Sequence, residues 1–184
     1  MKEPFRLDLE NIKRRAREHM SEGAVTETYN ANRESVIKVL NEALATEIVC
    51  NLRYRNNALV AQGINAEAVA AEFREHATQE QDHADKLAAR IMQLGGEPDM
   101  NPNTLATRSH ADYTTSRDLR TLLRENLIAE RVAISTYSEI IRWLGDDDPT
   151  TRRLLEFILE QEEEHADDLA NLLETPGSQK SSVA

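Results

Sequence analysis

The chain contains few residues of several types, and each shortage excludes a class of structure. A single cysteine, Cys50, rules out an intrachain disulfide and a cysteine-based zinc or iron–sulfur site. Six glycines and five prolines, most of them at expected helix ends, leave long stretches without a helix breaker. Aromatic residues make up only 4% of the chain and strand patterns are nearly absent, so the composition predicts an all-α protein.

Long apolar runs are also missing. No stretch approaches the roughly 18 apolar residues of a membrane-spanning helix. The first four residues do not begin a secretion signal. We therefore expect a cytoplasmic protein without a membrane partner. Acidic residues outnumber basic ones and give a net charge of −11, which predicts a soluble particle that attracts cations and has no general affinity for nucleic acid.

The length of 184 residues fits one domain with appendages. We expect a partly helical N-terminal arm over residues 1–29, a helical bundle over 30–174 and a flexible polar tail over 175–184. The arm carries a basic run between Lys13 and Arg17, which acidic neighbours dilute. Two roles remain open for it: binding to DNA, or a solvated helix face that also serves as a subunit contact.

Four stretches show apolar residues on one face of a 3.6-residue period, at about 30–62, 66–95, 115–145 and 148–174. The first is expected to end at Gly63, the second to follow Asn65, and the third to begin at Thr115–Ser116 with Asp118 in its first turn. The connection over residues 96–115 is far longer than the roughly 2–8 residues of a tight helix–helix turn. Because a 28-residue helix is about 42 Å long, this connection predicts one crossover that returns along the bundle.

Six charged residues interrupt the apolar rows. They are Glu47, Glu80, His83, Glu130, Glu162 and His165. Each histidine follows a glutamate by three residues, so the two side chains share one helix face. Each half of the chain also places a glutamate 32 or 33 residues before its Glu-x-x-His pair. The pattern therefore offers two matched halves of one ligand set.

Four carboxylates inside one bundle require cations, because an isolated buried carboxylate costs on the order of tens of kcal/mol in the idealised Born limit. Two divalent ions balance the four glutamates, with the two histidines as neutral ligands. Oxygen and imidazole ligands favour Fe(II) or Mn(II) over copper, and Zn(II) also fits. The alternative is that these six side chains are exposed on wrongly assigned helix faces.

Further residues repeat between the halves. Tyr54 and Tyr137 each follow the first glutamate of their half by seven residues, and Gln79 and Gln161 each precede the glutamate of a Glu-x-x-His pair. The repeat indicates a duplicated helical hairpin. The tyrosines have two open roles: to hydrogen-bond ligand carboxylates or donate an electron, or to serve as ordinary core aromatics.

With this pattern, residues 32–173 resemble the ferritin-like di-iron carboxylate superfamily, most closely bacterioferritins and Dps-type mini-ferritins. The resemblance implies a ferritin-like four-helix bundle with two iron ions per subunit. By position it makes Glu47 and Glu130 the terminal ligands, Glu80 and Glu162 the bridging carboxylates, and His83 and His165 the histidine ligands.

The chain departs from these relatives at three points. Gln81 stands where bacterioferritins carry a haem-ligating methionine, so we predict no haem. Gln79 and Gln161 replace an aspartate that the family often uses to support a histidine, so this support would be weaker or differently routed. A missing fifth helix and the N-terminal arm favour a 12-subunit shell, with 24 subunits as the alternative. Mini-ferritins usually build their site between subunits, whereas here both halves lie in one chain.

The resemblance implies a ferroxidase that oxidises Fe(II) with O2 or H2O2 and stores or detoxifies iron. Two alternatives remain: a di-metal peroxidase or oxidase of rubrerythrin or manganese-catalase type without storage, and a non-catalytic DNA-protecting particle. Cys50 has either a redox role or that of a small buried hydrophobe. His19 and His110 are expected at the surface. Glu75 and His76 either guide iron inward or form a solvated helix face.

Overall fold

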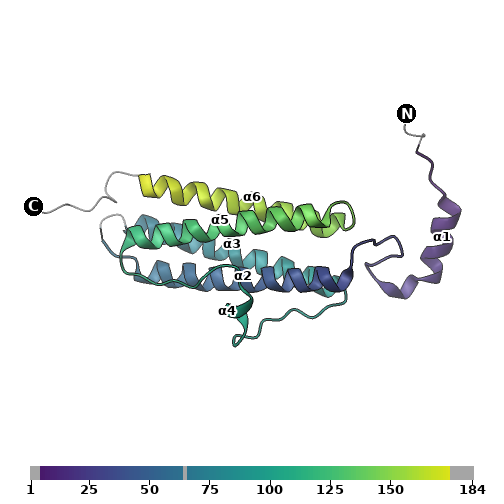
Figure 1. Ribbon diagram of the computed structural model, residues 1–184, viewed down its shortest axis with the longest axis horizontal. Coiled ribbons are helices and arrows are strands. Elements are labelled where there is room, and N and C mark those ends of the chain that lie inside the picture. The colour runs from purple at the N-terminus through teal and green to yellow at the C-terminus, as the bar shows by residue number, and fades with distance from the viewer. Residues whose placement is uncertain (1–4, 64–65, 175–184) are drawn as a thin grey trace, which may run out of the picture.

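A computed structural model describes residues 5–63 and 66–174, and all of its regular elements in these ranges are helical (Figure 1). The four long helices are α2 (Arg33–Val60), α3 (Ala66–Gln93), α5 (Leu119–Leu144) and α6 (Pro149–Glu174). Helices α2 and α3 form one hairpin and α5 and α6 the other, so the predicted four-helix bundle is confirmed. The expected tail, residues 175–184, and the expected helix cap Asn65 lie outside the described residues.

Side-chain caps fix where these helices begin. The side chain of Asn32 accepts a hydrogen bond from the Ser35 amide at 2.9 Å at the start of α2. The side chain of Asp118 accepts one from the Thr121 amide at 3.0 Å. The prediction that Asp118 lies in the first turn is therefore wrong, because it caps the helix, which begins at Leu119 and not at Thr115–Ser116.

The connection between α3 and α5 runs along α2, as predicted (Figure 1). Three side chains of α2 bind it in order. Asn41 accepts from the Asp99 amide at 2.7 Å, and Thr46 accepts from the His110 amide at 2.9 Å. Arg53 donates to the Asp112 carbonyl at 2.9 Å. This crossover also contains α4 (Leu105–Arg108), a helix too short to produce a periodic pattern.

The N-terminal arm forms α1 (Leu9–Glu18) and a 3-10 turn, Met20–Glu22, and α1 buries no residue and stands apart from the bundle in Figure 1. The arm joins the bundle through Tyr29, whose hydroxyl donates to Asp148 at 2.8 Å. Asp148 also caps α6 and forms an ion pair with Arg90 at 2.9 Å. One buried carboxylate thus connects the arm, α3 and α6.

Two apolar clusters fill the bundle, one towards each end. The first includes Val36, Leu40, Leu87, Ile91 and Leu155, and the second includes Phe73, Leu122, Leu123 and Leu169. Along each long helix, the predicted ligands lie between residues of the two clusters. The candidate site is therefore a polar layer enclosed by apolar layers. Within the described residues, no helix combines the length and the apolar composition that crossing a lipid bilayer requires.

Candidate metal centre

The six predicted ligands all lie in the polar layer between the two apolar clusters. Helix α2 carries Glu47, α3 carries Glu80 and His83, α5 carries Glu130, and α6 carries Glu162 and His165. Each residue is at most 1% exposed. The alternative that these side chains face solvent therefore holds for none of them.

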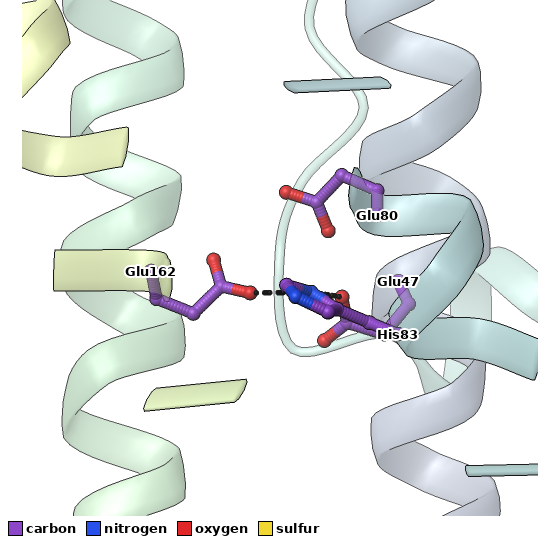
Figure 2. A group of neighbouring side chains, drawn as sticks. All are labelled: Glu47, Glu80, His83 and Glu162. Atoms are coloured by element: carbon purple, nitrogen blue, oxygen red, sulfur yellow. Dashed lines mark hydrogen bonds and ion pairs between the residues drawn. The ribbon is translucent and has the colours of Figure 1, made fainter. Parts of the chain in front are cut away.

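Their ligand atoms form two groups that share two glutamates. One group is Glu47, Glu80, His83 and Glu162, and the other is Glu80, Glu130, Glu162 and His165. Within each group, one potential ligand atom per residue lies within 4.8 Å of all the others. Figure 2 shows the first group, with Glu162 reaching across from α6 to the side chains of α2 and α3. The shared residues are the two glutamates expected to bridge.

The His83 imidazole has acceptors at both ring nitrogens. Nδ1 lies 3.1 Å from an oxygen of Glu47 and 3.1 Å from an oxygen of Glu162 (Figure 2). Nε2 lies 2.9 Å from the side-chain oxygen of Gln161. The Gln161 oxygen accepts a hydrogen bond from the Nε2–H group. This contact holds the ring in the orientation in which Nδ1 faces the carboxylates.

His165 repeats this arrangement from the other half. Its Nδ1 lies 3.5 Å from Glu80 and 3.9 Å from Glu130, and its Nε2 lies 2.8 Å from the side-chain oxygen of Gln79. Each glutamine therefore faces the histidine of the opposite hairpin. A neutral amide thus supports each histidine where the resemblance places an aspartate, so the support is not differently routed, and a weaker support stays a prediction.

The two tyrosines hold the two glutamates that are not shared between the groups. The Tyr54 hydroxyl donates to Glu130, and the Tyr137 hydroxyl donates to Glu47. In each glutamate the tyrosine occupies one oxygen, Oε1, and leaves the other facing a histidine. Both phenols are therefore positioning residues for carboxylates as well as members of the core.

The carboxyl groups divide into two kinds by their pKa. Burial and the negative charges of Glu162 and Glu47 raise the pKa of Glu80 well above its usual range. Burial and the charges of Glu47 and Glu130 raise that of Glu162 to about 8. Burial also acts to raise the pKa of Glu47 and Glu130, but the polar contacts around each carboxylate, those with His83 and His165 first among them, together outweigh it and lower both values, to about 2 for Glu130.

Both histidines prefer the protonated form. Burial acts to lower the pKa of His83, but hydrogen bonds to Glu162 and Glu47 outweigh it and raise the pKa to about 11. Burial is likewise outweighed at His165, where the nearby carboxylates of Glu130, Glu162 and Glu80 raise the pKa. At pH 7 and without metal, the imidazole of His83 and the carboxyl group of Glu162 thus hold protons, and the raised pKa values of His165 and Glu80 favour protons on those groups too. A metal must displace those protons.

Several ligand atoms in this layer lack ordinary partners. Within the described residues, Oε1 of Glu80, Oε2 of Glu130, Oε1 of Glu162 and Nδ1 of His165 are buried and make only ion-pair contacts, without a hydrogen bond of ordinary geometry. A buried polar atom without a partner costs about 1–3 kcal/mol. Oxygen and imidazole donors that converge in this way fit a pair of divalent metal ions.

Other candidate residues lie elsewhere. Gln81 is exposed and donates to Asp85 at 3.0 Å, while Cys50 is buried beside Ala111 and Ala129. His19 and His110 are exposed, as expected.

The expectation of a solvated face is wrong for His76, which is only 1% exposed. Its position in the inner row of α3, between Phe73 and Ala77, was the signal for burial.

An antiparallel helical bundle that brings two Glu-x-x-His pairs and two further glutamates into one buried layer has the architecture of the di-metal carboxylate proteins. The chain belongs to the ferritin-like family: residues 37–176 match the family described as Ferritin-like domain. This match covers most of the bundle and all six candidate ligands.

Individual relatives agree with this assignment. The chain is 30% identical over 131 residues to a bacterioferritin of Desulfovibrio desulfuricans, which covers 71% of this chain and 69% of that protein. It is also 30% identical over 140 residues to a DNA protection during starvation protein of Pyrococcus furiosus, covering 72% and 73%. The solved structure of a dodecameric thioferritin from Bacteroides fragilis, a bacterioferritin-related protein, aligns with a TM-score of 0.75 and 36% identity over 78% of this chain and 87% of that one.

Proposed function

We propose that the protein is a ferroxidase that oxidises Fe(II) with O2 or H2O2 at a di-iron site within one subunit, and that it stores or detoxifies iron. The observation that carries this proposal is the pair of ligand groups that share Glu80 and Glu162. Glu47 and His83 would hold one ion, Glu130 and His165 would hold the other, and the two shared glutamates would contribute to both. Mn(II) and Zn(II) are competitors for the same ligands.

Two Fe(II) ions held in this layer would give up one electron each, which balances the reduction of O2 and two protons to H2O2, or of H2O2 and two protons to two water molecules. The protein provides charge balance, orientation of the histidine ligands and exclusion of water. Four carboxylates balance the charge of two divalent ions, and the glutamines keep each histidine Nδ1 turned inward. The apolar clusters on both sides keep bulk water from the layer.

Substitution of a shared glutamate tests the reaction directly. Glu80→Ala removes a proposed ligand of both ions, so we expect rapid Fe(II) oxidation to be lost, as followed by the absorbance of the ferric product. Glu163→Gln is the matched control, because Glu163 is an exposed carboxylate beside the site. Oxidation by Glu80→Ala at the rate of the unsubstituted protein would exclude this site as the ferroxidase centre.

We further propose a homo-oligomeric shell, with twelve subunits favoured over twenty-four. The dodecameric relative from Bacteroides fragilis supports this number. Size-exclusion chromatography with light scattering, followed by iron loading, tests it. A shell that accumulates hundreds of iron ions supports storage, whereas a small oligomer that destroys peroxide without mineral would favour the peroxidase alternative.

The arm is not assigned to DNA binding, although one relative is named for DNA protection. Three of its basic side chains are paired with acidic ones of the same arm: Lys13 with Glu10 at 2.9 Å, Arg14 with Glu18 at 2.9 Å, and Arg15 with Glu27 at 3.3 Å. Because these pairs reduce the charge that a phosphate backbone would meet, they support a solvated or subunit-facing role.

A further inference from the structure

A second cluster of ligand-type side chains lies beside the polar layer and shares no residue with it. Glu72 and His76 come from α3, and Asp168 comes from α6. Nε2 of His76 lies 3.3 Å from an oxygen of Glu72 and 3.7 Å from an oxygen of Asp168. One ligand atom from each of the three residues lies within 4.8 Å of the other two. The spacing suits a single ion between them.

The imidazole of His76 is the feature that requires an explanation. The residue is 1% exposed, and neither ring nitrogen has a hydrogen-bond partner within the described part of the chain. A buried imidazole without partners is unfavourable by about 1–3 kcal/mol for each unsatisfied group. Nε2 faces the two carboxylates, so an ion held there satisfies it.

The carboxylates of this cluster face solvent. The side chain of Glu72 is 31% exposed and that of Asp168 is 51% exposed, whereas His76 is enclosed. The cluster therefore has an open side, through which an ion enters from water, and a closed side formed by the imidazole. Two carboxylates that lie this close together also repel one another until a cation lies between them.

The closed side is in contact with the di-metal layer. The His76 ring stacks on the ring of His165, with centroids 4.1 Å apart and an angle of 22° between the planes. The edge of the Tyr54 ring also contacts it, at 5.2 Å between centroids. The His76 imidazole therefore connects this cluster directly to His165, a proposed ligand of the buried centre.

We propose that Glu72, His76 and Asp168 form a third divalent-cation site, which takes Fe(II) from solvent before it reaches the buried centre. Two carboxylates and one imidazole suit Fe(II), Mn(II) or Zn(II), with water completing the coordination. The site itself stands on its own geometry, and its role in delivery rests on the proposed ferroxidase function.

Anaerobic equilibrium dialysis with Fe(II) tests the site. The unsubstituted protein is expected to bind three ions per chain, and the double variant Glu72→Gln/Asp168→Asn two. Asp85→Asn/Asp167→Asn is the matched control, because it removes the same charge from exposed positions on the same two helices and should keep three. A double variant that binds as many ions as the unsubstituted protein would overturn the proposal.

Crystals soaked in Zn(II) give an independent readout. An anomalous peak at the zinc edge is expected among Nε2 of His76, Glu72 and Asp168, at ligand distances of about 2.0–2.2 Å. No peak there at saturating Zn(II) would refute the site. A peak there in a protein without peaks in the buried layer would keep the outer site and refute the di-metal centre, so the two failures are distinguishable.

Oxidation kinetics test delivery. At low Fe(II), the initial rate of the double variant is expected to fall several-fold, while saturating Fe(II) restores the rate of the unsubstituted protein. The control variant should match the unsubstituted protein at both concentrations. An unchanged rate at low Fe(II) in a double variant that has lost the third ion would exclude the delivery role.

Discussion

The Tyr54 hydroxyl of α2 donates its hydrogen bond to Glu130 of α5, in the other hairpin of the bundle. Tyr137 of α5 donates to Glu47 of α2, so the exchange is reciprocal. The contacts of the two histidines with Gln161 and Gln79 also cross between hairpins. Each half thus supplies ligands whose positions the other half fixes, and one hairpin alone cannot build the centre.

Removal of either phenol hydroxyl should destabilise the metal-free protein by a similar amount. Tyr54→Phe and Tyr137→Phe each leave a buried carboxylate oxygen without its donor, at about 1–3 kcal/mol. For a chain of this size, that lowers the unfolding temperature by about 2–4 °C per kcal/mol. Thermal unfolding measures the change, with exposed Tyr113→Phe as the control. Two unchanged midpoints would show that these hydrogen bonds do not hold the layer.

Metal binding to the centre should release about two or more protons per chain at pH 7. The pKa of His83 is raised to about 11 and that of Glu162 to about 8, and those of His165 and Glu80 are also raised. His83 and Glu162 therefore hold protons at pH 7 that ligation displaces, and the raised pKa values of His165 and Glu80 act in the same direction. Affinity should therefore increase with pH. Calorimetry in buffers of different ionisation enthalpy counts the protons, and release of none would contradict this charge balance.

The glutamines should control metal affinity through the histidines. Gln161→Leu removes the acceptor at Nε2 of His83, and Gln79→Leu does the same for His165. Loss of such a partner typically costs about 10–100-fold in metal affinity. Competition with a chelator measures the change. Gln81→Leu, at an exposed position one residue after Glu80, is the matched control and should bind as the unsubstituted protein does.

Asp148 should make the fold sensitive to acid. Burial acts to raise its pKa, but hydrogen bonds from Thr151 and Tyr29 and the charge of Arg90 lower it below the unfolded value of 3.8. The contribution of the Asp148 carboxylate to the free energy of unfolding is thus present above pH 3.8, and it is lost as the pH falls through the lower pKa of the folded state. Asp148→Asn leaves Arg90 unpaired and should cost about 3–5 kcal/mol at neutral pH.

Denaturant unfolding at pH 7 and at pH 2–3 measures the cost of Asp148→Asn and its dependence on pH. The difference in unfolding free energy between Asp148→Asn and the unsubstituted protein should shrink at the lower pH, because Asp148 is then being protonated. Exposed Asp146→Asn is a control on the same connection, since the Asp146 side chain is fully exposed. A difference that is the same at both pH values would contradict the assigned role of Asp148.

The sequence was sufficient to predict the bundle and the six candidate ligands because the pattern that indicates them lies within each single helix. Apolar residues repeat with the helical period, and the ligands are charged residues within those rows. The crossover followed from the length of its connection alone. The cap role of Asp118 was missed, because a cap and a first-turn residue differ by a single position.

Side-chain contacts between the two hairpins could not be predicted from the residue pattern of a single helix. Tyr54 lies on the same helix face as Glu47, yet its partner is Glu130, a choice that depends on how the hairpins pack. The burial of His76 was visible in its row, but its approach to Asp168 depends on the packing of α6 against α3. Helix α4 left no pattern because four residues form only one turn.

An anomalous-scattering map at the iron edge, from crystals grown anaerobically with Fe(II), tests the central claim most directly. The account predicts two peaks per chain within the polar layer, both within coordination distance of Glu80 and Glu162. One peak should lie on the side of Glu47 and His83 and the other on the side of Glu130 and His165. Iron-saturated crystals with no peak between Glu80 and Glu162 would contradict the account.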